Sequence, residues 1–208
     1  MKIDSLSSSP DRAGKYTVKF SDGTVQRLYR QTVEDFGLYA GKELTQDEFS
    51  ALLDAAGKLS AKMRAVRIVS ASGVSKRELE HRLVSKGEKQ EDASEAVRWM
   101  SELSLLDDSR MAQTIVERCI AKGYGFARAK QALYEKRIPK ELWDAALENY
   151  PDQIDRITEY LDSKLDGNFD EKSVRRAVEA LMRRGHSYGN IRTALSQLKL
   201  DLEQYPEE

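Results

Sequence analysis

The chain contains 208 residues, of which 40% are hydrophobic and 33% are charged, and its formal net charge is −1. This near-neutral balance excludes a protein that binds nucleic acid through its overall charge alone. The single cysteine excludes an intramolecular disulfide and a multi-cysteine metal site. No run of about 18 apolar residues predicts a membrane span, and the N-terminus lacks the apolar segment of a signal peptide. We therefore expect a cytoplasmic protein without membrane contact.

Residues 1–13 are rich in serine and predict a loose leader. Residues 14–44 predict a short β-hairpin with a connector, because apolar and polar residues alternate in KYTVKF and Asp22-Gly23 supplies a two-residue turn. Beyond residue 31 the pattern is almost entirely helical. The expected fold class is therefore mainly α, with a short N-terminal β-hairpin.

A related phrase occurs three times in the helical part: SASGVSKRELEHRLVS, AKGYGFARAKQALYEK and RRGHSYGNIRTALSQL. Each copy has a glycine and, two positions later, a residue suited to cap a helix; the pairs are Gly73 with Ser75, Gly123 with Gly125, and Gly185 with Ser187. Glycine in the left-handed conformation often ends a helix. Serine, and less often glycine, is favoured at the start of the next one. Each copy therefore predicts two helices joined by a tight turn.

Apolar residues at helical spacing around these turns predict tandem three-helix repeats. The predicted divisions are 45–106 for the first repeat with its lead-in helix, 107–150 for the second, and 151–208 for the third with an acidic tail. Thr45 with Glu48, and Ser75 with Glu78, match the pattern of a capping box. Pro139 is suited to open a helix of the second repeat.

Two further helices are expected from the apolar pattern. The third helix of the first repeat is predicted from Ala93, Ala96, Val97, Met100 and Leu103. An additional helix is predicted within 151–170, where the spacing between successive copies is twelve residues longer than before. The third repeat is bounded less clearly than the other two.

The sequence shows no catalytic constellation. His81 and His186 are the only histidines and have no ligand-spaced partners, so we expect no metal. A glycine-lysine phosphate loop is also missing, so we expect no ATP hydrolysis by the chain itself and no cofactor. Asp107 and Asp108 stand just before an apolar helical pattern, where first-turn and capping acids are favoured over catalytic carboxylates.

Charge is segregated along the chain. Residues 118–140 carry seven Lys and Arg against one acid, and residues 171–199 carry seven against two. Between them, residues 141–170 carry nine acids against two bases, and residues 200–208 add four acids. Such alternation suits a surface that meets phosphates and protein together. It also suits ordinary solvated helix faces, and both interpretations stay open on the sequence alone.

Several short motifs, taken together, match a known family. They are Ser75, Glu78, Leu79 and Lys86-Gly87; then Leu105-Leu106-Asp107-Asp108 and Ala112; then Gly123-Tyr124-Gly125; and finally GHSYGNI near the C-terminus. In this order, residues 60–198 resemble the RecX family of recombination regulators. Met111 departs from the family pattern where an aromatic residue is usual. Arg137 replaces the glycine before Ile138, so the form of the turn after residue 136 stays open.

The resemblance implies a fold and a partner. The fold would be an elongated, curved array of three-helix repeats without catalytic activity of its own. The partner would be the RecA recombinase, mostly as a filament on single-stranded DNA, whose growth and activities the protein would limit. The array would span several recombinase subunits, with basic faces toward DNA phosphates and acidic segments toward the recombinase. Single-stranded DNA itself is a further candidate partner, and we expect a monomer.

The candidate binding residues are cations on the second and third copies, together with one tyrosine: Arg128, Lys130, Lys136, Arg137, Arg176, Arg183, Arg184, Tyr188 and Arg192. Arginine forms two-pronged hydrogen bonds with phosphate or carboxylate. Tyr188 and Phe126 each follow the turn glycine by three positions. They could stack on a base, or they could brace the turn.

Two other classes of protein compete with this interpretation. A helix-turn-helix transcription regulator would explain the tight turns, but the three turns have the same form and no single recognition helix stands out. A helical repeat protein that binds only other proteins would show no salt-dependent affinity for DNA.

Overall fold

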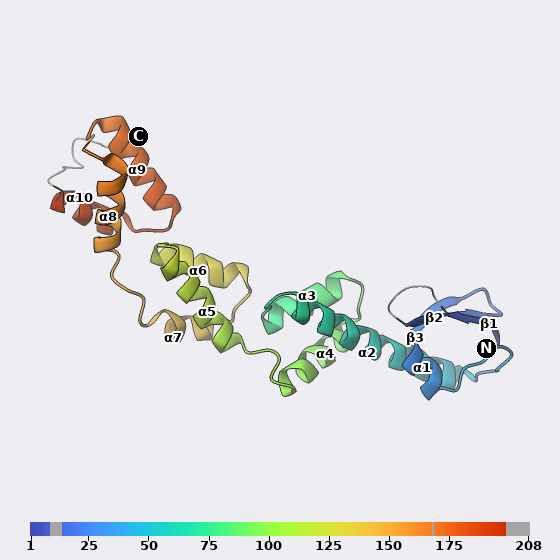
Figure 1. The fold of residues 1–208 in the computed structure, drawn as a ribbon. Helices are drawn as coiled ribbons and strands as arrows, with labels where there is room; N and C mark the ends of the chain where they lie inside the picture. Colours follow the sequence, from blue (N-terminus) through green and yellow to red (C-terminus); the bar gives the residue numbers. More distant parts are fainter. Residues whose placement is uncertain (9–13, 168, 199–208) are drawn as a thin grey trace. The chain divides into compact units, whose positions relative to one another are not determined.

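The computed structural model describes residues 1–8, 14–167 and 169–198, and the chain divides into two compact units, Met1–Leu106 and Asp107–Glu208. It is mostly helical, with one small antiparallel sheet at the N-terminus (Figure 1). Within the described residues, no helix combines the length and hydropathy needed to cross a membrane. Residues 200–208, the acidic tail of the sequence analysis, lie outside the described part of the chain.

The first unit begins with three strands in the order β1-β2-β3: β1 (Ile3–Ser8), β2 (Lys15–Phe20) and β3 (Val25–Tyr29). The predicted hairpin corresponds to β2 and β3, and the side chain of Asp22 accepts a hydrogen bond from the Thr24 backbone N–H in the turn. The loose leader is wrong for Ile3–Ser8, which pair with β2. Ile3 is fully buried, and its N–H donates to the Lys42 carbonyl, so the strand is held on both sides.

A single long helix connects this sheet to the first repeat. After the short α1 (Arg30–Asp35), α2 (Gln46–Ala71) begins at Thr45 with the predicted capping box to Glu48. The first turns of α2 pack on the sheet, where the rings of Phe20 and Phe49 meet edge to face with centroids 5.1 Å apart. Its later turns enter a second core with the helices that follow.

The first repeat consists of α2, α3 (Lys76–Ser85) and α4 (Gln90–Glu102). Ser75 caps α3 as predicted, because its side chain accepts from the Glu78 N–H. The left-handed turn expected at Gly73 is wrong: α2 ends at Ala71, and Ser72 is extended with φ −163°. Leu103 was expected on the apolar face of the third helix, but it follows the end of α4 and is half exposed.

In the second unit, α5 (Asp108–Ala121) and α6 (Phe126–Glu135) pack with a short 3-10 turn, η1 (Lys140–Leu142), and with α7 (Trp143–Leu147). Asp107 caps α5 as expected, accepting from the Arg110 N–H. Pro139 opens the 3-10 turn rather than an α-helix. The additional helix predicted within 151–170 is α8 (Ile154–Leu165).

The third repeat is formed by α8, α9 (Glu171–Arg183) and α10 (Tyr188–Gln197), which share one apolar core. In the third repeat, the helix that joins the pair around the turn is α8, which precedes this pair in the chain. In the first repeat, the joining helix is α4, which follows the pair. The two copies therefore complete their bundles with helices from opposite sides of the repeated phrase.

Three helices of the second unit end in the same way. At the ends of α5 and α9 the left-handed residues are Gly123 (φ 64°) and Gly185 (φ 85°), as predicted. The following N–H donates to the carbonyl five residues earlier, from Tyr124 to Cys119 and from His186 to Leu181, a hydrogen bond typical of a Schellman end. Arg137 closes α6 in this way with φ 53°, so it keeps the turn geometry without the family's glycine.

Candidate functional site

The second and third copies of the repeated turn pack directly against each other. The Gly125 N–H donates to the Arg184 carbonyl at 2.9 Å, and the Ala127 N–H donates to the Gly185 carbonyl at 3.2 Å. Both donors belong to the start of α6, where helical N–H groups have no partner within their own helix. The third repeat thus supplies the acceptors for the second, and we call this contact the Gly125–Gly185 joint.

The joint requires glycine on both sides. A Cβ at Gly125 would stand 2.1 Å from the Gly185 oxygen, and a Cβ at Gly185 would stand 2.4 Å from the Arg128 nitrogen. Both distances are far below van der Waals contact, and the atoms met are backbone atoms that side-chain rotation does not move. This explains why the second copy has glycine at a capping position where the first and third copies have serine.

His186 lies beside the joint and is only 6% exposed. Its Nε2 is 3.1 Å from the Gly123 carbonyl. Because a carbonyl only accepts hydrogen bonds, Nε2 carries the proton, and Nδ1 is then an acceptor in the neutral ring. Nδ1 is buried and has no partner among the described residues. Burial lowers the pKa of His186, the hydrogen bond to Gly123 opposes this, and the Arg184 charge lowers it further.

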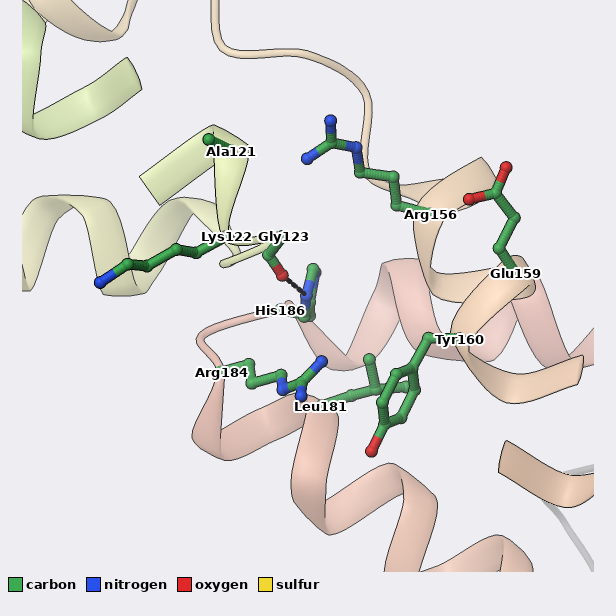
Figure 2. A pocket seen from close by; sticks show the side chains of 9 residues that line it. All are labelled: Ala121, Lys122, Gly123, Arg156, Glu159, Tyr160, Leu181, Arg184 and His186. Atoms are coloured by element: carbon green, nitrogen blue, oxygen red, sulfur yellow. Dashed lines mark hydrogen bonds between the residues drawn. The ribbon is translucent and has the colours of Figure 1, made fainter. Parts of the chain in front are cut away.

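A pocket of about 440 Å³ opens at the same place, and we call it the joint pocket. It is lined by Ala121, Lys122, Gly123, Arg156, Glu159, Tyr160, Leu181, Arg184 and His186. Figure 2 shows the Arg156 and Arg184 guanidinium groups on either side of the His186 ring, whereas the Lys122 ammonium extends away from them. The two guanidinium groups, with Glu159 as the one carboxylate of the lining, make this a positively charged pocket.

Aromatic residues brace the turn of the second repeat. The Tyr150 hydroxyl donates to the Tyr124 carbonyl at 2.7 Å, and burial raises the pKa of Tyr150 to about 12. The Phe126 ring meets Tyr150 edge to face at 5.5 Å between centroids, and the Lys130 ammonium lies 4.8 Å from the Phe126 centroid. With these contacts, bracing of the turn accounts for Phe126 better than stacking on a base does.

The predicted cations of the second repeat lie along α6 and at its end. Arg128 forms an ion pair with Glu135 at 3.1 Å, in which both side chains are partly exposed. Lys130 covers Phe126. Lys136 and Arg137 are exposed just beyond the last residue of α6. At 1.5 Å per residue they stand roughly 15 Å along the helix axis from the joint.

The predicted residues of the third repeat occupy α9, its end and α10. Arg176 and Arg183 are exposed on α9, and Arg183 lies 3.9 Å from Glu179 in a largely solvated pair. Tyr188 is 41% exposed at the start of α10, and Arg192 is exposed further along that helix. Arg184 differs from the others because its guanidinium stacks on the Tyr160 ring, 4.6 Å from the centroid.

The structure therefore brings some of the predicted residues together and not others. Arg128 and Arg184 meet at the joint through their backbones, whereas the remaining cations are distributed along three helices. Arg156, Tyr160 and His186 also line the joint pocket, and none of them was among the residues predicted to bind a partner. The sequence did contain one signal of the joint. The second copy of the turn has glycine where the first and third copies have serine, which indicates a close approach of another backbone.

The remaining titratable groups offer little chemistry. Cys119 is buried in the core of the second repeat, and burial raises the pKa of its thiol. The described residues contain no group of three or more His, Cys, Asp or Glu side chains that could hold a metal ion. Asp107 serves as a helix cap.

Tandem three-helix units with basic, exposed helices define a helical repeat protein. Comparison with known proteins is consistent with this class. Residues 107–147 match the family description "RecX, second three-helix domain". A regulatory protein RecX from Vibrio campbellii is 31% identical over 141 residues, which cover 66% of this chain and 91% of the relative. Another from Clostridioides difficile is 24% identical over 214 residues and covers 98% of this chain and 97% of the relative.

Solved structures show the same fold. A crystal structure of regulatory protein RecX superposes with a TM-score of 0.62 at 18% identity and covers 95% of this chain and 98% of the other. The structure of RecX from Lactobacillus salivarius gives a TM-score of 0.61 at 20% identity and covers 70% of this chain and 98% of the other. The chain belongs to the RecX family of regulatory proteins.

Proposed function

We propose that this chain is a non-enzymatic, cytoplasmic regulator that binds the RecA recombinase on single-stranded DNA and limits filament growth, and so damps recombination and DNA repair by RecA. Membership of a family of regulatory proteins supports a regulatory role. The observation that carries the DNA side of the proposal is the set of exposed cations on α9 and α10, Arg176, Arg183 and Arg192. Arg183 directly precedes Arg184, which lines the joint pocket.

These cations are suited to exchange partners. The pair between Arg183 and Glu179 is exposed on both sides, and so is the pair between Arg128 and Glu135. Solvated ion pairs contribute about 1 kcal/mol or less. A phosphate offers arginine two parallel charged hydrogen bonds, which are stronger, so contact with DNA would displace such pairs at small cost.

The transcription-regulator alternative is less consistent with α6. A helix-turn-helix protein reads base edges with the first residues of its second helix. Here the first residues of α6 are turned into the joint, where Gly125 and Ala127 donate to carbonyls of the third repeat. The start of α6 is therefore covered by protein rather than presented to a groove.

RecA-dependent ATP hydrolysis on single-stranded DNA tests the proposal. We expect the wild-type chain to suppress hydrolysis at a stoichiometric ratio or below. Charge reversal at Arg176, Arg183 and Arg192 together is expected to weaken this suppression about tenfold or more. These three residues avoid Arg184, whose stacking on Tyr160 contributes to local structure.

A matched control reverses three exposed cations elsewhere: Arg77, Lys86 and Lys164. It changes the net charge equally, so its expected inhibition is close to that of the wild type. No effect of the wild-type chain on hydrolysis would rule out the proposal. Equal loss of inhibition in both triple variants would show that Arg176, Arg183 and Arg192 have no specific part in the inhibition.

A further inference from the structure

The joint pocket has a charge distribution that the repeat fold does not require. Its arginines come from different helices: Arg156 lies in the first turn of α8, and Arg184 directly follows α9. Each is fixed by a second contact, Arg156 donating to the Ile120 carbonyl and Arg184 stacking on Tyr160. Neither contact neutralises the charge of the arginine, so two positive groups are held beside one pocket.

The position of these groups is also well defined. Ile120 and Gly123 lie at the end of α5, the first helix of the second repeat, whereas Tyr160, Arg184 and His186 belong to the third. The Gly125–Gly185 joint and the hydrogen bond from His186 to Gly123 fix the two sides together. A ligand bound here would therefore meet guanidinium groups that lose little further freedom on binding, which favours affinity.

We propose that the joint pocket binds one phosphate group of a single-stranded nucleic acid backbone. Arg156 and Arg184 would donate charged hydrogen bonds to its oxygens, and the helical cations Arg183 and Arg192 lie on the adjoining segments to contact neighbouring phosphates. The choice of a nucleic acid as the source of the phosphate rests on the proposed function, which the inference deepens by assigning a specific contact.

The first experiment uses the full chain without recombinase. Binding of a fluorescent oligo-dT is measured by anisotropy over a series of salt concentrations, for the wild type and for Arg156→Gln and Arg184→Gln. We expect each variant to weaken binding about tenfold, as for loss of a charged hydrogen bond. Loss of one phosphate contact should also reduce the slope of log K against log salt by about 0.7.

Matched controls come from the same two helices. Lys164→Gln removes an exposed charge from α8, and Arg175→Gln removes one from α9 on the side opposite Arg184, nine residues away. Both are expected to bind oligo-dT within about twofold of the wild type. Arg184→Lys keeps the charge but loses the two-pronged geometry, so partial weakening is expected, and thermal melts monitor the fold of every variant.

A second measurement needs no substitution in the pocket. The chain has only two histidines, so the His186 imidazole signals in NMR are assigned with one variant, His186→Gln. The positive charge of Arg184 lowers the pKa of His186, and an anion bound to Arg184 would offset that charge. We therefore expect oligo-dT to raise the pKa of His186, while inorganic phosphate or ATP at the same phosphate concentration raises it less.

The outcomes separate the inference from the proposed function. Wild-type affinity in both arginine variants, with no change of the His186 pKa, would overturn the pocket assignment. So would tighter binding of ATP than of oligo-dT, or binding of an acidic peptide with no binding of oligo-dT. If the variants bind oligo-dT weakly and the wild type still has no effect on RecA, the inference stands and the proposed function fails. If the arginine variants bind oligo-dT like the wild type but no longer suppress ATP hydrolysis by RecA, the proposed function stands and the inference fails.

Discussion

Gly125 and Gly185 lie so close that a Cβ on the first would stand 2.1 Å from the carbonyl oxygen of the second. The contact joins two copies of one repeated turn through glycines that lie 60 residues apart in the chain. It gives the repeated phrase two roles: within each copy it ends one helix and starts another, and between copies it sets the distance at which the second and third repeats pack.

The first prediction concerns Gly125→Ser, which gives the second copy the residue found in the other two. Serine is a better helix cap than glycine, but only by a few tenths of a kcal/mol. Forcing a side chain into a packed site costs about 1–3 kcal/mol, so the clash should win. We expect urea unfolding of the second unit to show a net loss of about 2 kcal/mol.

Gly189→Ala is the control for this substitution. Gly189 lies in the first turn of α10, and a Cβ there meets only the Ser187 hydroxyl, at 4.0 Å. Alanine has the higher helix propensity, so we expect a gain of about 0.5 kcal/mol. A stabilised Gly125→Ser variant would show that the joint is not formed in solution.

Helix caps are set by nearby residues and are readable from the sequence, whereas strand β1 is not. Thr45, Ser75 and Asp107 were predicted as caps because a cap depends on residues three positions away, and all three are observed. Strand β1 was missed because SLSS has little strand propensity. Ile3 is instead fixed by burial and by pairing with β2 and residue 42, neither of which a local pattern encodes.

The joint pocket was beyond the sequence for a different reason. Arg156 stands in a segment with nine acids and two bases, so the charge count placed it in the acidic segment 141–170. It lines the same pocket as Arg184 because α8 packs on α9 and α10, although the two arginines are 28 residues apart in the chain. Charge sums along a chain describe segments, whereas a binding pocket depends on which segments fold together.

The second prediction concerns Arg137, a non-glycine residue with φ 53°. Left-handed backbone costs an ordinary residue about 1–2 kcal/mol, and glycine adopts it without this cost. Since glycine also loses more entropy on folding, we expect Arg137→Gly to stabilise the second unit by about 0.5–1 kcal/mol in urea unfolding. Lys136→Gly is the control, because Lys136 has φ −89° and should gain nothing. Destabilisation by Arg137→Gly would mean that the Arg137 side chain contributes more than the backbone strain costs.

The third prediction concerns pH. Burial lowers the pKa of His186 in the folded state below its ordinary value of 6.5. The unfolded chain therefore binds a proton first as pH falls, and the folded state loses stability from about pH 6.5 downward until its own lower pKa is passed. Urea midpoints between pH 8 and pH 5 should show this decline in the wild type.

Replacement of each histidine separates their contributions to the decline. His186→Gln should flatten the part of the pH dependence that lies just below 6.5, although it lowers stability at pH 8 by losing a fitted side chain. His81→Gln removes an exposed histidine on α3, and its urea midpoints should depend on pH as those of the wild type do. An unchanged decline in His186→Gln would assign the pH dependence to other groups.

The fourth prediction uses Cys119 as a reporter of opening in the second repeat. The thiol is 6% exposed, and burial raises its pKa, so a thiol reagent such as DTNB should react slowly with the folded chain and rapidly in urea. Leu133→Ala empties part of the same core and costs about 2–5 kcal/mol, so reaction should accelerate by tenfold or more. Leu83→Ala makes an equal change in the core of the first repeat and should leave the rate near that of the wild type if the two units open separately. Equal acceleration in both variants would show that the units unfold as one, and fast reaction of the wild type would contradict the burial of Cys119.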